Sequence, residues 1–302
     1  MKILRIGTRK SDLALWQAQT VQHLIEKMGI QTTLIPISSD GDLNLTQPLY
    51  ALGVEGVFTK ALDAALLNNE IDIAVHSLKD VPTQLAEGIH QAAVLSRANP
   101  LDAIVFHPDF KNWESSPFIG TGSLRRKAQW LRKFPSHTTT NLRGNLQKRI
   151  EKLNRSKWGG ALFAVAGLER LGWPVKREVL EWMIPAPGQG AITVCCHSEK
   201  TDLIHQLKTI SCEKTAKCTT LERTFLRLLE GGCTAPIGAL ASVKDHTISF
   251  KAGLFSLDGT KAIEYENSFR GEHIQEYAMR AADTIKALGG EQLLDDIKKT
   301  FH

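Results

Sequence analysis

The sequence predicts two successive α/β domains followed by a small α+β domain. Up to about residue 190, apolar strand-like segments alternate with amphipathic helix-like segments, which is the pattern of a parallel or mixed sheet covered by helices. After about residue 213 this alternation stops, and segments with a strand-like period of two follow one another. At 302 residues, the chain is long enough for two or three domains of ordinary size.

The first part of the chain has the pattern of a βαβ unit. LRIGT (4–8) is expected to form a strand, and Ser11 is expected to cap a helix that ends near Gly29. The next strands are predicted at TTLIPIS (32–38) and IDIAV (71–75), with a helix through KALDAALLNN before the second of them. This order implies a parallel or mixed sheet.

A second α/β unit begins near Asn99 and Pro100. Four apolar segments predict its strands, at 103–106, 118–121, 138–142 and 161–166. Two prolines and two glycines in IPAPGQG (184–190) indicate a crossover or a hinge. The apolar segment AITVCCH (191–197) follows, and we expect it to return the chain to the sheet of the first domain.

The last part begins with a helix that ends at Gly231, close to Cys233. Antiparallel strands and two closing helices, near 273–288 and 290–300, complete a small α+β domain. The predicted domains are 1–98 with 191–212, then 99–190, and finally 213–302.

Composition indicates a soluble globular protein rather than a membrane protein. The chain is 42% hydrophobic and 23% charged, it has no apolar run of membrane-spanning length, and no signal peptide is expected. Its five cysteines lack zinc-site spacing, so no metal site is expected, and reduced thiols favour the cytoplasm. The net charge of +5 comes without a polybasic run, so neither nucleic acid nor membrane is expected as a partner.

Several arginines stand where a strand gives way to a helix. In GTGSLRRKAQ (120–129), Ser123 can cap a helix whose first turn carries Arg125 and Arg126, although the helix dipole disfavours cations there. An anionic ligand explains this placement better than helix stability does. The same placement recurs at Arg9, Arg143, Arg149 and Arg170.

The six arginines together suggest a site for small molecules that carry several carboxylates. If their turns face one cleft between the two α/β domains, the cleft attracts and holds such anions. The alternative interpretation is a set of basic turns that face solvent.

The segment AVHSLKDVP (74–82) places polar side chains after a strand that is expected to be buried. His76, Lys79 and Asp80 then lie at the carboxyl end of the strand, where α/β sheets bind their ligands. The charge of Lys79 favours the ionised form of Asp80. The alternative is a solvated loop with a helix cap.

The segment LLEGGCTAPIGA (228–239) places Cys233 in a tight turn. Gly231 and Gly232 on one side and Pro236 on the other leave the backbone open, so a bulky group could approach the sulfur or be attached to it. The alternative is that Cys233 is a small apolar filler.

Seven segments carry a resemblance to a known family. They are GTRKSDLALWQAQ, AVHSLKDVP, GTGSLRR, LRGNLQKR, AVAGLERLG, PAPGQGA and LLEGGCTAPIGA. In this order and spacing, over nearly the whole chain, they resemble the porphobilinogen deaminases, also called hydroxymethylbilane synthases. The resemblance implies two lobes like those of type II periplasmic binding proteins and a small third domain.

The resemblance also implies an activity and a cofactor. The family joins four porphobilinogen molecules head to tail, with loss of ammonia, onto a covalent dipyrromethane, and hydrolysis then releases the linear tetrapyrrole hydroxymethylbilane. Cys233 matches the position that holds the dipyrromethane through a thioether. We therefore expect a transferase of tetrapyrrole and haem biosynthesis that acts as a monomer in the cytoplasm.

The family's functional residues transfer onto matching positions of this sequence. Asp80 matches the catalytic aspartate, which also contacts the cofactor. The other cofactor contacts match Lys79, Thr121, Ser123, Arg125, Arg126 and Gln189. The substrate contacts match Arg9, Ser11, Gln17, Phe58, Arg143, Arg149 and Arg170.

Three positions depart from the family pattern. Asp12 stands where proline is usual, and Gly122 stands where serine is common. Glu55 replaces a usual lysine in a loop that covers the active site in the family. A carboxylate in that loop would repel an anionic pyrrole chain unless it points to solvent.

Two other functions compete with this interpretation. A non-catalytic sensor of a small carboxylate ligand, built from periplasmic-binding-like lobes, would explain the arginines. It would explain neither the Cys233 turn nor the third domain. Nucleic-acid binding is suggested only by the net charge, and strong salt-dependent binding to arbitrary DNA would be its mark.

Overall fold

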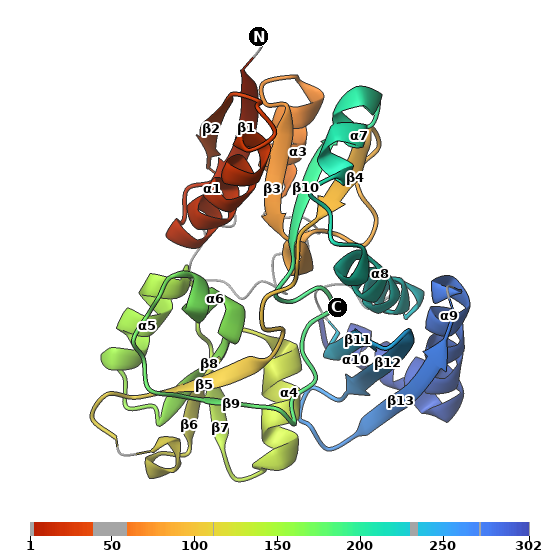
Figure 1. The fold of residues 1–302 in the computed structure, drawn as a ribbon. Coiled ribbons are helices and arrows are strands. Elements are labelled where there is room, and N and C mark those ends of the chain that lie inside the picture. The colour runs from red at the N-terminus through yellow and green to blue at the C-terminus, as the bar shows by residue number, and fades with distance from the viewer. Residues whose placement is uncertain (1–2, 39–58, 111, 230–234, 272, 302) are drawn as a thin grey trace. The chain divides into compact units, whose positions relative to one another are not determined.

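The computed structural model describes residues 3–38, 59–110, 112–229, 235–271 and 273–301 (Figure 1). Backbone contacts divide these residues into two compact units. The first unit takes its residues from 3–98 and 190–217, and the second takes its residues from 99–189 and 218–301.

The first unit is built on a mixed sheet of five strands. They are β1 (Leu4–Arg9), β2 (Thr32–Ile37), β3 (Ile73–Ser77), β4 (Ile89–Val94) and β10 (Ile192–His197). Their order is β2-β1-β3-β10-β4, in which β1 is parallel to β2 and β3, whereas β10 is antiparallel to β3 and β4. The late strand β10 therefore lies between β3 and β4, which do not pair with each other.

Helices cover both faces of this sheet (Figure 1). On one face, α1 (Asp12–Glu26) buries Ala18 and Val21 in a cluster with apolar side chains of β1, β3 and β10. The helix α7 (Thr201–Lys208) adds to this cluster. On the other face, α3 (Lys60–Leu67) packs in a second cluster. Because side chains alternate along a strand, β3 and β10 contribute to both clusters.

The second unit contains another mixed sheet of five strands. They are β5 (Asp102–Phe106), β6 (Phe118–Gly120), β7 (Thr138–Thr140), β8 (Gly160–Ala164) and β9 (Arg177–Val179). Their order is β7-β6-β8-β5-β9, with β6 parallel to β7 and β8 and with β5 antiparallel to β8 and β9. The first residue of β5, Asp102, is therefore paired with Ala164, the last residue of β8.

Three helices of the second unit each follow a strand of this sheet. The helix α4 (Leu124–Lys133) follows β6, α5 (Leu146–Asn154) follows β7, and α6 (Val165–Arg170) follows β8. Trp130 anchors α4 in a core of aromatic rings, its centroid 5.1 Å from that of Trp113. Since β6, β7 and β8 are parallel, all three helices begin at the same edge of the sheet as Asp102.

The C-terminal part of the second unit is an antiparallel sheet with helices. Its strands are β11 (Ile237–Lys244), β12 (Thr247–Phe255) and β13 (Ala262–Arg270). Its helices are α8 (Glu213–Leu228), which crosses the boundary between the units, α9 (Ile274–Ile285) and α10 (Glu291–Phe301). A π-helical turn, η4 (Lys286–Gly290), joins α9 to α10. Phe225 of α8 packs edge-on against Phe250 of β12, with ring centroids 5.5 Å apart.

The predicted fold class is confirmed, because two mixed α/β sheets precede an antiparallel sheet with helices. All eight strands predicted before residue 200 are present, and β10 returns to the first sheet as expected. The strands β4 and β9 and the joining of α9 to α10 were not expected. The boundaries of three separate domains stay a prediction. No helix in the described residues is both long and apolar enough to cross a bilayer.

Candidate functional site

In the first unit, the predicted residues gather where β1 and β3 end. Arg9 is the last residue of β1. Lys79 and Asp80 belong to a one-turn 3-10 helix, η2 (Leu78–Asp80), that directly follows β3. Because β1 and β3 are parallel neighbours, the three side chains start from one edge of the sheet, where α/β proteins bind ligands.

Two further predicted residues lie on α1 beside this edge. Ser11 caps the helix, and its hydroxyl oxygen accepts a hydrogen bond of 3.4 Å from the N–H of Ala14. The buried amide of Gln17 exchanges hydrogen bonds of 2.8 and 3.2 Å with the hydroxyl of Ser77, the last residue of β3. These bonds fix α1 against the strand that leads to Asp80.

His76 of β3 is buried next to the same edge. Burial, together with the nearby charge of Arg9, lowers the pKa of His76 to about 4. The imidazole is therefore uncharged at neutral pH. The positive charge at this edge comes from Arg9 and Lys79 instead.

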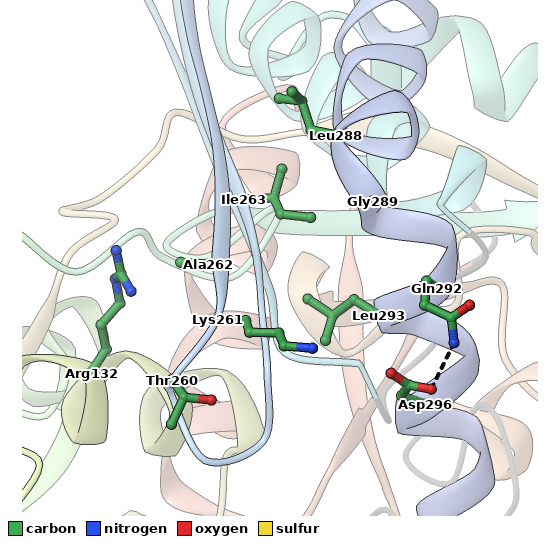
Figure 2. A pocket seen from close by; sticks show the side chains of 10 residues that line it. All are labelled: Arg132, Thr260, Lys261, Ala262, Ile263, Leu288, Gly289, Gln292, Leu293 and Asp296. Atoms are coloured by element: carbon green, nitrogen blue, oxygen red, sulfur yellow. Dashed lines mark hydrogen bonds between the residues drawn. The ribbon is translucent and has the colours of Figure 1, made fainter.

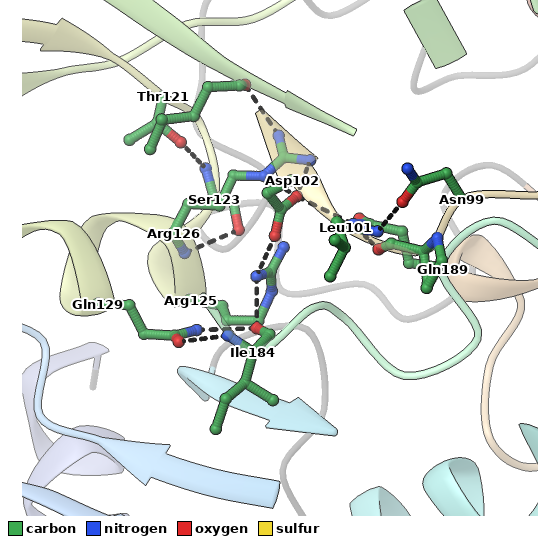
Figure 3. Close-up of polar contacts among 12 residues, drawn as sticks. Asn99, Leu101, Asp102, Thr121, Ser123, Arg125, Arg126, Gln129, Ile184 and Gln189 are labelled. Atoms are coloured by element: carbon green, nitrogen blue, oxygen red, sulfur yellow. Dashed lines mark hydrogen bonds and ion pairs between the residues drawn. The ribbon is translucent and has the colours of Figure 1, made fainter. Parts of the chain in front are cut away.

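In the second unit, the carboxylate of Asp102 joins three of the predicted cofactor residues (Figure 3). Its Oδ2 accepts a hydrogen bond of 2.6 Å from Nη1 of Arg125. Its Oδ1 accepts one of 2.9 Å from Nε of Arg126 and lies 2.8 Å from Nη2 of that residue. The amide of Gln189 donates a third hydrogen bond to Oδ1, at 2.9 Å. Asp102 has no exposed surface.

The charges in this cluster do not balance. Burial alone raises the pKa of Asp102, but the charges of Arg125 and Arg126, with hydrogen bonds from Arg125 and Gln189, hold it well below its usual range. Two guanidinium groups and one carboxylate give these three side chains a net charge of +1, and each of the three residues is at most 5% exposed. The buried Nε of Arg125 also has no hydrogen-bond partner among the described residues.

Side chains before and within α4 fix the start of this helix and join it to the segment that precedes Gln189. Ser123 caps α4 by accepting a hydrogen bond of 3.4 Å from the N–H of Arg126. Thr121 accepts one of 3.3 Å from the N–H of Ser123. Farther along α4, Gln129 makes two hydrogen bonds, of 2.8 and 2.9 Å, with the main chain of Ile184.

The remaining predicted arginines of the second unit follow β7 and β8. Arg143 is buried, and burial lowers the pKa of its guanidinium group. Arg149 donates from Nε to the carbonyl of Gly144 at 2.7 Å. Burial lowers the pKa of Arg170 to about 10, although Glu169 opposes this. An anionic ligand bound to the buried groups would offset the cost of burying their charge.

The predicted residues thus form two sets, one in each unit, at or beside the edge where parallel strands end. The first set contains Arg9, Ser11, Gln17, Lys79 and Asp80. The second set contains Thr121, Ser123, Arg125, Arg126, Arg143, Arg149, Arg170 and Gln189. Cys233 and Phe58 lie outside the described residues, and a single cleft shared by both sets stays a prediction.

Known proteins identify the family. Residues 4–205 match the model of the porphobilinogen deaminase "dipyromethane cofactor binding domain", and residues 216–287 match that of the porphobilinogen deaminase C-terminal domain. The porphobilinogen deaminase of Desulforamulus reducens is 39% identical over 98% of this chain and 98% of its own length. That of Desulfitobacterium hafniense is 40% identical over 99% and 98%. The chain belongs to the porphobilinogen deaminase family.

Membership in the porphobilinogen deaminase family makes the chain a transferase of tetrapyrrole biosynthesis with a dipyrromethane cofactor. Solved structures with some likeness include the periplasmic VFT2 domain of BvgS from Bordetella pertussis, at 10% identity and a TM-score of 0.43 over 69% of this chain and 86% of that one. An ancestral arginine-binding protein is 14% identical, with a TM-score of 0.37 over 70% and 91%. Likeness at this level carries no argument about function.

Two of the three departures from the porphobilinogen deaminase pattern have a local structural explanation. A β-carbon on Gly122 would lie 2.5 Å from the carbonyl oxygen of Leu142, so serine would not fit there without a backbone shift. Asp12 is the first residue of α1, where the helix dipole favours a carboxylate. Glu55 lies outside the described residues.

Asp102 is absent from the residues that the sequence predicts for a porphobilinogen deaminase site. It opens the apolar strand DAIVF (102–106) as its single charged residue. A lone carboxylate at the start of a buried strand indicates that a cation is buried with it. That pattern was the signal available in the sequence.

A separate cavity of about 530 Å³ holds none of the residues predicted for the porphobilinogen deaminase site (Figure 2). It lies between the β12–β13 turn and α10, with Arg132 and Lys261 on one side. Asp296 on the other side accepts a hydrogen bond of 2.9 Å from Gln292. Most of the lining is exposed, including 62% of Leu288, so this is an open surface hollow.

Proposed function

We propose that this chain joins four porphobilinogen molecules head to tail, with loss of ammonia, onto a dipyrromethane attached to the sulfur of Cys233. Hydrolysis then releases hydroxymethylbilane and leaves the dipyrromethane on the protein. The observation that carries the proposal is the arginine pair at the start of α4. Two buried guanidinium groups, Arg125 and Arg126, share one protein carboxylate.

The arginine pair fits a dipyrromethane, which carries an acetate and a propionate on each ring. A ligand carboxylate would balance the net charge of the cluster and would give Nε of Arg125 an acceptor. When bound, the dipyrromethane supplies the terminal pyrrole carbon to which the first porphobilinogen is joined. Arg125 and Arg126 are proposed to hold its carboxylates, and the further contacts are Lys79, Thr121, Ser123 and Gln189.

Asp80 is proposed as the catalytic residue. Loss of ammonia from porphobilinogen and attack by a pyrrole place positive charge on ring nitrogens. A carboxylate fixed in η2 can accept hydrogen bonds from those N–H groups, stabilise the charge and take up the proton that the new bond releases. The hydrogen bonds between Gln17 and Ser77 help to fix the strand from which η2 continues.

The other arginines are proposed to bind the acetate and propionate groups of substrate and growing chain. Each added porphobilinogen brings two carboxylates, and one charge-assisted contact is worth roughly 1.5–3 kcal/mol. Burial already disfavours the charges of Arg143 and Arg170, so these two gain most from an anion. The proposed substrate residues are Arg9, Ser11, Gln17, Phe58, Arg143, Arg149 and Arg170.

We further propose a cytoplasmic monomer of three domains that needs neither nucleic acid nor membrane. A sensor of a small carboxylate ligand would account for the arginines. It would leave residues 216–287, which match the C-terminal domain of porphobilinogen deaminases, without a role. Catalysis therefore has more support than sensing.

Denaturing intact-mass measurement tests the proposal. The purified chain is expected to exceed its polypeptide mass by two pyrrole units, and peptide mapping is expected to find them on Cys233. Cys233→Ala should have the bare mass, whereas the matched control Cys212→Ala, which also removes one thiol, should keep the addition. An active enzyme with the bare polypeptide mass would contradict the proposal.

A further inference from the structure

The arginine pair is held by a residue from another strand. Arg125 and Arg126 are neighbours in the first turn of α4, so their side chains leave the helix about 100° apart. Both guanidinium groups nevertheless reach one carboxylate, that of Asp102 at the start of β5. Asp102 can stand there because antiparallel β5 begins at the edge where β6 and β8 end.

The two carboxylate oxygens of Asp102 accept hydrogen bonds from different donors. Oδ2 takes Arg125, and Oδ1 takes both Arg126 and the amide of Gln189. Main-chain carbonyls complete the fixation, since Arg125 donates to Ile184 at 2.7 Å and Arg126 donates to Leu162 at 3.0 Å. Each guanidinium group is therefore oriented by an anion and by a neutral acceptor.

The arrangement fixes the pair without neutralising it. One carboxylate cancels one of two positive charges, and the carbonyls and the amide of Gln189 cancel none. A surface ion pair would leave both side chains mobile in water, but here the arginines are 5% exposed and Asp102 is fully buried. The result is a rigid pair, and the three side chains together carry one net positive charge.

We infer that Asp102 is a positioning residue, which presents Arg125 and Arg126 in one fixed geometry to the carboxylates of the dipyrromethane. The inference rests on the proposed role of the two arginines. It adds that loading with the cofactor depends on the orientation of the pair, set by Asp102, as well as on the charge of the pair. A merely structural ion pair would affect folding alone.

Two variants separate positioning from stability. Asp102→Asn removes the charge and keeps the shape, and Asp102→Glu keeps the charge but moves it by one methylene group. Asp72→Asn is the matched control, because Asp72 is a buried, arginine-bonded carboxylate of the first unit. Intact mass gives the fraction of chains with two extra pyrrole units, and thermal unfolding gives Tm for the same samples.

Positioning predicts that Asp102→Glu recovers much of the Tm lost in Asp102→Asn, yet stays at least about tenfold lower than wild type in the ratio of loaded to bare chains. Per loaded chain, kcat should fall while KM for porphobilinogen stays within about twofold, since the pair holds the anchored end of the product chain. Asp72→Asn should be fully loaded.

Several results would overturn the inference. Wild-type loading in folded Asp102→Asn or Asp102→Glu would do so, as would loading that follows Tm alone across all three variants. If neither Asp102 variant folds, Asp102 is needed for the stability of the fold, and the positioning role is not supported. A wild-type chain without the two pyrrole units would instead contradict the proposed function itself, so the two failures can be told apart.

Discussion

Two buried carboxylates, Asp72 in the first unit and Asp102 in the second, use the same ionic chemistry in different places. Asp72 immediately precedes β3, at the edge where the parallel strands begin. It accepts hydrogen bonds of 3.0 and 3.2 Å from the Arg5 side chain and one of 3.2 Å from Lys200. Asp102 lies at the opposite kind of edge, where strands end and ligands bind.

The partners of the two carboxylates differ in their access to water. The side chains of Arg5 and Lys200 are 32% and 26% exposed, whereas those of Arg125 and Arg126 are 6% exposed. Water can therefore solvate the cations of Asp72 when their bonds break. Arg125 and Arg126 are too deeply buried for water to replace Asp102 in the same way. The ion pairs of Asp72 and Asp102 are chemically alike. Their place in the sheet and the solvent access of their cations distinguish a purely structural ion pair, at Asp72, from one that belongs to a proposed binding site, at Asp102.

The largest expected effect is on the stability of the second unit. Asp102→Asn should lower the free energy of unfolding by about 3–5 kcal/mol, because it removes the carboxylate that two buried guanidinium groups share. Asp72→Asn should cost about 1–2 kcal/mol, because Arg5 and Lys200 can turn to water. Urea denaturation at pH 7 measures both, and equal losses would break the comparison.

The same pair gives a pH dependence with a definite sign. Burial raises the pKa of each carboxyl group, but the cations and hydrogen bonds around Asp72 and Asp102 outweigh it and lower both pKa values. Their contribution to stability is therefore present above about pH 4, the value in an unfolded chain, and is lost as the pH falls below it. The stability differences between wild type and the two variants should shrink in that range.

The next effect separates catalysis from stability within one sheet. Asp80 lies beyond the end of β3, and Asp72 lies just before its beginning. Asp80→Ala should turn over porphobilinogen at least about a hundredfold more slowly with an almost unchanged Tm, because it removes charge stabilisation and proton transfer. Asp72→Asn should show the converse, a lower Tm with near-normal turnover per folded chain. Near-normal turnover in Asp80→Ala would remove Asp80 from the catalytic role.

The smallest effect extends the comparison to thiols. Cys212 is partly exposed, and hydrogen bonds from Thr215, together with weaker ones from Lys214 and Ser96, lower its pKa against the effect of burial. Burial raises the pKa of Cys196 to about 11, although Lys200 opposes this. Iodoacetamide at pH 7 should therefore label Cys212 at least about tenfold faster than Cys196 in the native chain, as peptide mapping can measure. Equal labelling rates would mean that neither the hydrogen bonds to Cys212 nor the burial of Cys196 controls the reactivity of these two thiols.

Local patterns in the sequence predicted much of the fold. Strands such as β1, β3 and β8 are apolar, bounded by turn residues and separated by amphipathic segments. The strand β4 (IHQAAV) was missed because His90 and Gln91 interrupt its apolar pattern. The strand β9 was missed because it is a three-residue edge strand with two charged residues. Such strands depend on their neighbours in the sheet more than on their own sequence.

The site residues also divide into those that local sequence patterns predicted and those that depend on contacts between distant segments. Arg125 and Arg126 could be found because Ser123 and the glycines around it mark a strand-to-helix turn in a continuous stretch of sequence. Asp102 could be noticed as a lone carboxylate in an apolar strand, but its partners could not be identified, because it stands 23 residues before Arg125 and reaches it only when β5 runs antiparallel beside β8. Pairing across a sheet is a non-local property, and the sequence around a lone acidic residue does not identify the cation that it will contact. The joint placement of both residue sets in one cleft stays a prediction for the same reason.

The position of β10 has a consequence for the order in which the chain can fold during synthesis. The sheet of the first unit cannot close until residue 197 has left the ribosome, because β4 is joined to β3 only through β10. All strands of the next sheet lie between residues 102 and 179, so that sheet can close earlier. Although domains generally fold from the N-terminus onward, the edges of β3 and β4 that β10 later covers stay unpaired in the nascent first unit while the next sheet is completed.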